Sequence, residues 1–205
     1  MVAVPVEAGV LEYATAAFTL PGERQSGDEY LVLSTPRGYL IAVIDAVGHG
    51  VEAARAAAVA AACLRSDAQR SLPGIVNSCH EKLKSTRGVV MSLALFDRQE
   101  DTLAWLGVGN VEGILIHDDT EAPRENIVMR GGVIGSHLPV LQPVRLQIER
   151  SDTLIFATDG IGLAFEHQLC VSRPLQELAD HICANHRTGA DDALVLVARL
   201  REGGA

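Results

Sequence analysis

The stretch that decides the fold is Leu40–Gly50, LIAVIDAVGHG. Its first five residues, Leu40–Ile44, are apolar and predict a buried strand. This strand runs into Asp45, and a Gly-rich turn, Ala46–Gly50, follows. Ionised carboxylates are rarely buried unless they are paired or hold a metal. An acid at the end of a buried strand therefore indicates a cation ligand, and its companions should lie at other strand ends.

Composition is typical of a globular protein with one core. The 205 residues suffice for one sizeable core, so we expect a single domain over residues 1–205. The net charge of −9 argues against nucleic acid as a partner, because a phosphate backbone attracts a basic surface. The sequence has neither a run of 18 apolar residues nor the layout of a signal peptide. We therefore expect a cytoplasmic protein without a membrane partner.

The four cysteines do not have the spacing of a metal site. Cys63, Cys79, Cys170 and Cys183 each lie in an apolar or helical stretch, and no two form a CxxC pair. A zinc site would need closer spacing. We expect buried free thiols in a reducing cytosol.

A predicted hairpin brings a second acid beside Asp45. Tyr30–Ser34 and Tyr39–Ile44 are apolar runs separated by a turn signal, Thr35–Gly38. Asp28 stands just before the first run, and Asp45 directly follows the second. Because the outer ends of an antiparallel pair lie side by side, these two carboxylates should share one edge of a sheet.

The rest of the chain alternates between helix and strand patterns. Helices are predicted by a long Ala-rich run, by a segment with Ser71 as N-cap, and by a third apolar segment. These helices span Val51–Ser66, Ser71–Lys84 and Leu175–His186. Short apolar runs between turn signals predict the other strands. They are Val10–Leu20, Val89–Phe96, Thr102–Leu106, Val111–His117, Ile127–Met129, Val144–Ile148, Thr153–Ala157 and Ala193–Leu200.

Acidic residues recur at the ends of these strands. Asp28 and Asp45 are joined by Asp159, which follows a buried strand, and by the pair Asp191 and Asp192, which precedes the last one. Carboxylate and backbone carbonyl oxygens suit hard cations such as magnesium or manganese. Two such ions about 4 Å apart would hold a water and a phosphoryl group for in-line attack. A single Asp of this kind is commonly a turn or cap residue, whereas four together favour a metal centre.

The order of these motifs resembles a known family. They are Gly27-Asp28, Asp45–Gly50, Thr158-Asp159-Gly160 and Asp191-Asp192. The chain is similar, over nearly its whole length, to the metal-dependent PPM (protein phosphatase 2C-like) Ser/Thr phosphatases, in their SpoIIE/RsbX-like bacterial branch of sporulation and stress response. Arg87-Gly88 before a strand and Val108–Val111 support a narrower likeness to RsbX-like stressosome phosphatases.

The resemblance implies an α+β fold and a site. The fold is a four-layer α-β-β-α sandwich, in which helices flank a central antiparallel β-sandwich. The site would hold two manganese or magnesium ions, bridged by Asp45. Asp159 and Asp191 would complete the shell of the first metal, and Asp28 and the carbonyl of Ala46 would serve the second. The motif favours Asp191 over Asp192, although the residues alone leave this choice open.

The resemblance also implies an activity and partners. A metal-activated water would hydrolyse phosphoserine or phosphothreonine, and the substrates would be phosphorylated STAS-domain proteins of a stressosome. Two alternatives are a catalytically weak or inactive PPM-fold regulator that binds a partner, and a small-molecule phosphoesterase.

Four positions depart from the family's pattern or stay open. Ala46 stands where the family usually has Gly, which is tolerable unless the position needs a positive φ. Leu194 replaces the usual Thr of the last motif, which is expected to cost a hydrogen bond near the site. Arg24 is either a phosphate ligand or a solvated turn residue. His49 is either a proton donor or a simple turn histidine.

Overall fold

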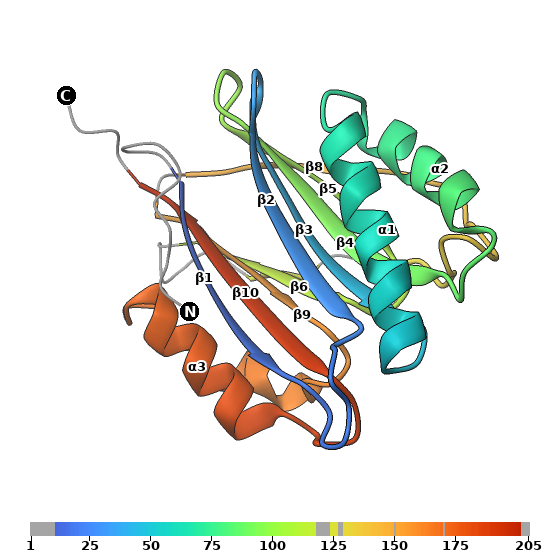
Figure 1. Cartoon of the computed structure of the whole chain (residues 1–205). Coiled ribbons are helices and arrows are strands. Elements are labelled where there is room, and N and C mark those ends of the chain that lie inside the picture. The colour runs from blue at the N-terminus through green and yellow to red at the C-terminus, as the bar shows by residue number, and fades with distance from the viewer. Residues whose placement is uncertain (1–10, 118–123, 127–128, 150, 170, 202–205) are drawn as a thin grey trace.

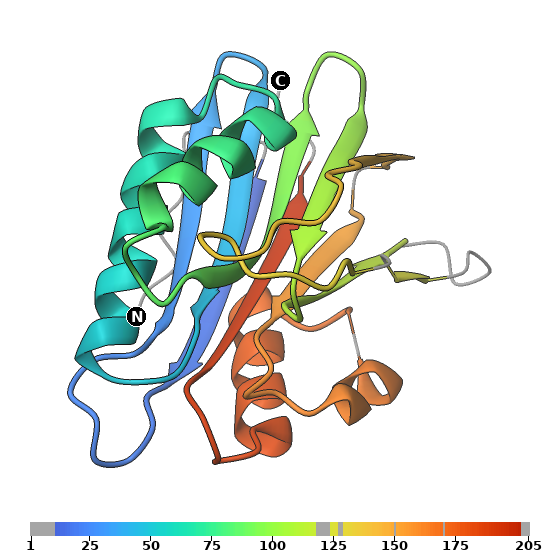
Figure 2. The ribbon, with the colours of Figure 1, turned by 90° about the vertical axis from the view of Figure 1, so that its right-hand side faces the viewer.

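Two antiparallel sheets pack face to face and carry helices on their outer sides (Figure 1). The computed structural model describes residues 11–117, 124–126, 129–149, 151–169 and 171–201. Helices α1 (Val51–Asp67) and α2 (Leu72–Leu83) cover one sheet, and α3 (Leu175–His186) covers the other, as the rotated view in Figure 2 also shows. The predicted α+β four-layer sandwich is therefore confirmed.

Within the described residues, each sheet has five strands, and neighbouring strands pair antiparallel. Sheet A has the order β1-β10-β9-β6-β7, and sheet B has the order β2-β3-β4-β5-β8. The strands of sheet A are β1 (Leu11–Phe18), β10 (Ala193–Leu200), β9 (Thr153–Ala157), β6 (Glu112–Ile116) and β7 (Glu125–Asn126). Those of sheet B are β2 (Asp28–Thr35), β3 (Gly38–Ala46), β4 (Val89–Asp97), β5 (Thr102–Val108) and β8 (Val144–Gln147).

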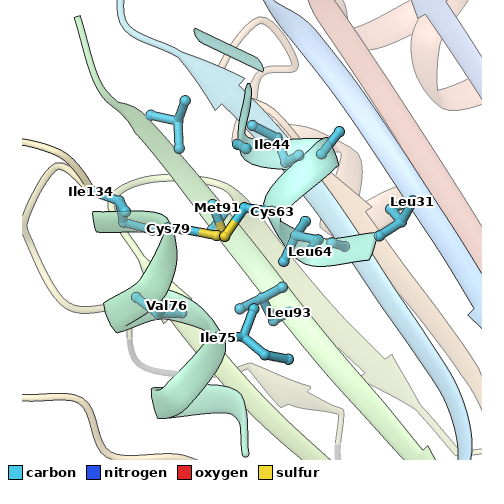
Figure 3. Close-up of a cluster of buried hydrophobic side chains, with 14 of the residues drawn as sticks. Leu31, Ile44, Cys63, Leu64, Ile75, Val76, Cys79, Met91, Leu93 and Ile134 are labelled. Atoms are coloured by element: carbon cyan, nitrogen blue, oxygen red, sulfur yellow. The ribbon is translucent and has the colours of Figure 1, made fainter. Parts of the chain in front are cut away.

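Small side chains allow α1 to lie close to sheet B. Ala53, Ala56 and Ala60 on α1 are fully buried against this sheet. Figure 3 shows the cluster between the two helices and the strands, where Cys63 of α1 and Cys79 of α2 point toward each other. The alanine run, a strong helix former, thus gives both the helix and its close packing.

Large side chains fill the space between the two sheets. Trp105 of β5 and Phe156 of β9 meet edge to face, with ring centroids 5.0 Å apart. Gly113 lies under these rings, and a Cβ at this position would come within 1.8 Å of Trp105 Cζ2. Since both aromatic side chains are fully buried, the position has no room for a side chain.

The predicted local signals are largely confirmed. Strands β2 and β3 form the expected hairpin, with Thr35 opposite Gly38. Ser71 caps α2, accepting a hydrogen bond from Gly74 N–H at 3.3 Å. A 3₁₀ helix at Leu163–Gln168 was not predicted.

Some predictions fall partly outside the described residues. The predicted strand Ile127–Met129 does so, and the nearby described strand is β7. Cys63, Cys79 and Cys183 are free and buried as expected, whereas Cys170 lies outside the described residues. Within the described part of the chain, no helix is both long and apolar enough to cross a membrane.

Candidate metal centre

Sheet B places two acids side by side. Asp28 opens β2 and pairs directly with Asp45, next to last in β3. The hairpin fixes this register, so the prediction from the sequence is confirmed. One residue further on, Ala46 N–H donates to the carbonyl of Gly27 at 3.1 Å. This bond holds the turn after Asp45 against the segment that leads into Asp28.

Sheet A brings the other acids to the same end of the sandwich. Asp159 lies just after β9, and Asp191 and Asp192 lie just before β10, its neighbour. The hydroxyl of Thr158 joins the two sheets, because it donates to Asp28 Oδ2 at 2.7 Å and accepts from Leu194 N–H at 2.9 Å. The Thr158 hydroxyl thus makes a hydrogen bond at Leu194, the residue that stands where the family usually has Thr.

The two adjacent acids at the start of β10 have different roles. Asp192 is buried, and its two oxygens accept the backbone N–H groups of Leu20 at 2.8 Å and Gly27 at 2.7 Å. Asp191 is half-buried, and its Oδ1 accepts Asp192 N–H at 2.8 Å. Asp192 therefore clamps the loop between β1 and β2. Among the described residues, Asp191 accepts a hydrogen bond at Oδ1 alone, so its other carboxylate oxygen is available for a ligand.

These carboxylates lie close enough to shift one another's pKa values. Burial, and after it the charges of the four neighbouring acids, together raise the pKa of Asp45 to about 8; these acids are Asp28, Asp159, Asp191 and Asp192. The pKa of Asp28 is raised to about 7, mainly by burial; the Thr158 hydrogen bond lowers it, and the charges of Asp192, Asp159 and Asp191 raise it. Bound divalent cations would remove this cost, because they compensate the charge that burial and repulsion disfavour.

The donor set fits hard divalent cations. Carboxylate oxygens predominate, and the remaining predicted ligand is the backbone carbonyl of Ala46. Ala46 meets the condition set from the sequence, since the described non-Gly residues with positive φ are Asp101 and Ser151. As the side chains stand, no three His, Cys, Asp or Glu groups among the described residues converge on one point as a ready-made cage. The fit therefore rests on the chemistry of the donors and on their shared position.

The histidine and arginine considered from the sequence lie nearby. His49 is exposed, and its Nδ1 lies 2.6 Å from Glu23 Oε1, so the histidine is held by a turn carboxylate. Arg24 is exposed in the same turn as Glu23. These positions leave both roles of each residue open.

Sequence reasoning missed two neighbours of the centre. Asn110, after β5, donates from Nδ2 to Asp159 Oδ2 at 2.7 Å and so orients this acid from the opposite sheet. Arg87, before β4, lies against Gly48 in the turn after Asp45. In the sequence their dipeptides, Gly109-Asn110 and Arg87-Gly88, support the family likeness, and an Asn or Arg beside a strand end is the signal that points to them.

Comparison with protein families gives an assignment. Residues 35–201, well over half of the chain, match the family model of stage II sporulation protein E (SpoIIE). The chain belongs to the SpoIIE family. This family is protein phosphatase 2C-like, so the predicted PPM family is confirmed. The matched region includes Asp45, Asp159 and Asp191 and begins after Asp28.

Solved structures show the same fold. A protein from work on the bacterial stressosome, "a modular system that has been adapted to control secondary messenger signaling", is 29% identical, with a TM-score of 0.83 over 92% of this chain and 99% of its own. RsbX in complex with magnesium is 17% identical, with a TM-score of 0.84 over 97% and 98%. The catalytic domain of the serine/threonine phosphatase PstP with two manganese ions is 18% identical, with a TM-score of 0.70 over 94% and 99%. No curated protein matches the sequence.

Proposed function

We propose that this SpoIIE-family chain is a metal-dependent serine/threonine protein phosphatase of bacterial signalling. The observation that carries the proposal is the meeting of acids from both sheets at one end of the sandwich. Asp28 and Asp45 come from sheet B, and Asp159 and Asp191 come from sheet A. The fold likeness to RsbX with magnesium and to PstP with two manganese ions supports a divalent metal requirement.

The proposed ligands follow from the positions of the donors. Asp45 would bridge two ions, Asp159 and Asp191 would hold the first, and Asp28 with the Ala46 carbonyl would hold the second. Manganese or magnesium there supplies an activated water and neutralises charge on the phosphoryl group. The chain's own residues orient these donors, because Thr158 bonds Asp28 at 2.7 Å and Asn110 bonds Asp159 at 2.7 Å.

The choice of Asp191 over Asp192 is supported by their hydrogen bonds. Both oxygens of Asp192 are occupied by backbone N–H groups, at 2.8 Å and 2.7 Å. An ion bound to Asp192 would have to compete with these two bonds. Asp191 has no such constraint within the described part of the chain, where its Oδ1 alone accepts a hydrogen bond, from the adjacent backbone.

The proposed substrates are phosphorylated STAS-domain proteins of a stressosome. Support comes from the structure solved in stressosome work, at 29% identity over 92% of the chain, and from the fold of RsbX. A cytoplasmic location and a single catalytic domain over residues 1–205 complete the proposal, and both stay predictions.

The test is manganese-dependent release of phosphate from a phosphothreonine peptide. We expect activity that requires metal, disappears with a chelator, and falls in Asp45→Asn to the level seen with the chelator. Glu81→Gln is the matched control, because it removes one charge from an exposed side chain on α2. Metal binding without activity on any phosphoprotein, including phosphorylated STAS-domain proteins, would favour a partner-binding regulator. Activity confined to nucleotides would favour a small-molecule phosphoesterase.

A further inference from the structure

Arg87 is held at the end of the sheet where the acids meet. It precedes β4, which pairs with β3 so that Val90 lies opposite Asp45. Two backbone bonds hold the residue that follows Arg87: Val47 N–H donates to the carbonyl of Gly88 at 3.2 Å, and Gly88 N–H donates to Thr86 Oγ1 at 3.0 Å. The backbone of Arg87 is therefore fixed one strand away from the bridging acid.

Two glycines allow the Arg87 side chain to lie against the turn that follows Asp45, Ala46–Gly50, which we call the metal-site turn. Gly48, in that turn, has a φ of +85°, and a Cβ there would lie 2.7 Å from Arg87 Nη1 and 3.9 Å from Cζ. The guanidinium thus occupies the space that a side chain at Gly48 would need. Gly88 has a φ of +80°, and a Cβ there would come within 2.6 Å of Val133 Cγ1. Both positions require glycine for this arrangement.

The guanidinium of Arg87 has donors to spare. Four other arginines pair with carboxylates at 2.6 to 3.3 Å; they are Arg37, Arg70, Arg145 and Arg201. Arg87 is exposed, and within the described ranges it pairs with no carboxylate. An arginine that is positioned by its backbone but left without an internal partner is suited to an external anion.

The surroundings of Arg87 are strongly acidic, so a phosphate group bound there needs a positive charge beside it. Five carboxylates lie at this end of the sandwich; they are Asp28, Asp45, Asp159, Asp191 and Asp192. A phosphate group carries negative charge and is repelled by any part of this cluster that bound cations leave uncompensated. The planar fork of arginine matches two phosphate oxygens and keeps its charge at all working pH values.

We propose that Arg87 binds the phosphoryl oxygens of the substrate at the rim of the metal centre, and holds the inorganic phosphate product in the same way. This inference rests on the proposed phosphatase function. It gives the chain a phosphate ligand on the loop between α2 and β4, rather than in the turn that contains Arg24.

The experiment compares Arg87→Ala and Arg87→Lys with wild type in the manganese-loaded protein. Arg65→Ala is the control, since Arg65 is an exposed arginine in the last turn of α1, about 20 Å along the helix from the metal-site turn. The measurements are KM and kcat with p-nitrophenyl phosphate and with a phosphothreonine peptide, the inhibition constant of inorganic phosphate, and calorimetric binding of phosphate and of manganese.

We expect Arg87→Ala to raise KM for both substrates and the inhibition constant of phosphate about tenfold, with manganese affinity and thermal midpoint unchanged. Arg87→Lys should recover part of the loss, because it keeps the charge without the fork. Arg65→Ala should match wild type. A KM increase confined to the peptide would show that Arg87 contacts the polypeptide rather than the phosphate, which overturns the proposal.

The two proposals fail in different ways. Wild type that hydrolyses phosphopeptides while Arg87→Ala keeps its phosphate affinity would overturn the role of Arg87 and leave the phosphatase function intact. Wild type that hydrolyses nothing would contradict the phosphatase function, and calorimetry would then decide separately whether phosphate binding depends on Arg87.

Discussion

Replacing Asp192 with alanine is expected to destabilise the protein, whereas the same change at Asp191 is expected to impair manganese binding. Asp192 is 3% exposed and accepts two backbone N–H groups, from Leu20 and Gly27. Asp191→Ala removes one local bond, from Asp192 N–H. Two adjacent residues of one type thus provide a matched pair, each variant serving as the control for the other.

The magnitude for Asp192→Ala follows from its hydrogen bonds. Each bond to a charged acceptor contributes about 1.5–3 kcal/mol, and both donors lose their acceptor in the variant. Removing one negative charge from the acidic cluster offsets part of this loss, by about 1–2 kcal/mol. We expect a net loss of about 1–5 kcal/mol for Asp192→Ala, and a change below about 1 kcal/mol for Asp191→Ala.

The assay is urea unfolding with a chelator present, followed by the fluorescence of the chain's single tryptophan, the fully buried Trp105. Manganese binding to each folded variant is then measured by calorimetry. The reasoning is refuted if Asp192→Ala unfolds within 1 kcal/mol of wild type, or if Asp191→Ala binds manganese as wild type does.

Two further predictions concern pH and packing. The folded pKa values of Asp28 and Asp45, about 7 and about 8, lie above the ordinary value of 3.8, so the metal-free fold binds more protons than the unfolded chain. Their contribution to stability is therefore full below pH 4 and is lost as pH rises through 7 to 8. The free energy of unfolding of the metal-free protein, measured with urea, should fall by about 1–3 kcal/mol between pH 6 and 9, and saturating manganese should abolish that loss. A metal-free stability that does not change with pH would contradict the raised pKa values. Gly113→Ala places a Cβ 1.8 Å from Trp105 Cζ2 and should lower the thermal midpoint by about 5–10 °C. Gly131→Ala is the control and should match wild type, because a Cβ there has nothing within 4 Å. Equal midpoints for the two variants would show that Trp105 and Phe156 can move to make room.

The features that sequence reasoning predicted were those that local patterns determine. Apolar runs ended by acids gave the strand ends, and the tight turn at Thr35–Gly38 fixed the register that pairs Asp28 with Asp45. The family likeness then gave the packing of the two sheets, which no local pattern contains. The assignment of the ligands stays a prediction, because neither the fold nor the family match tests individual residues.

Contacts between distant segments were not predictable in the same way. The clamp from Asp192 to Gly27 spans 165 positions, and the bond from Asn110 to Asp159 spans 49. The position of Arg87 depends on a glycine in another loop, whose missing side chain provides the space. Such contacts arise only when the two sheets pack, so the spacing of apolar residues along the sequence does not predict them.

The division of the acids between the two sheets also bears on the dynamics of the sandwich. If an ion is held as proposed, by Asp45 of sheet B and by Asp159 just after β9 of sheet A, it would crosslink the sheets at an end where ladder hydrogen bonds do not join them. Its binding free energy would oppose separation of the sheets, by about 2.7 kcal/mol at a free metal concentration 100 times Kd. Amide hydrogen exchange at the ends of β3 and β9 should therefore slow together on metal loading, as one cooperative opening unit.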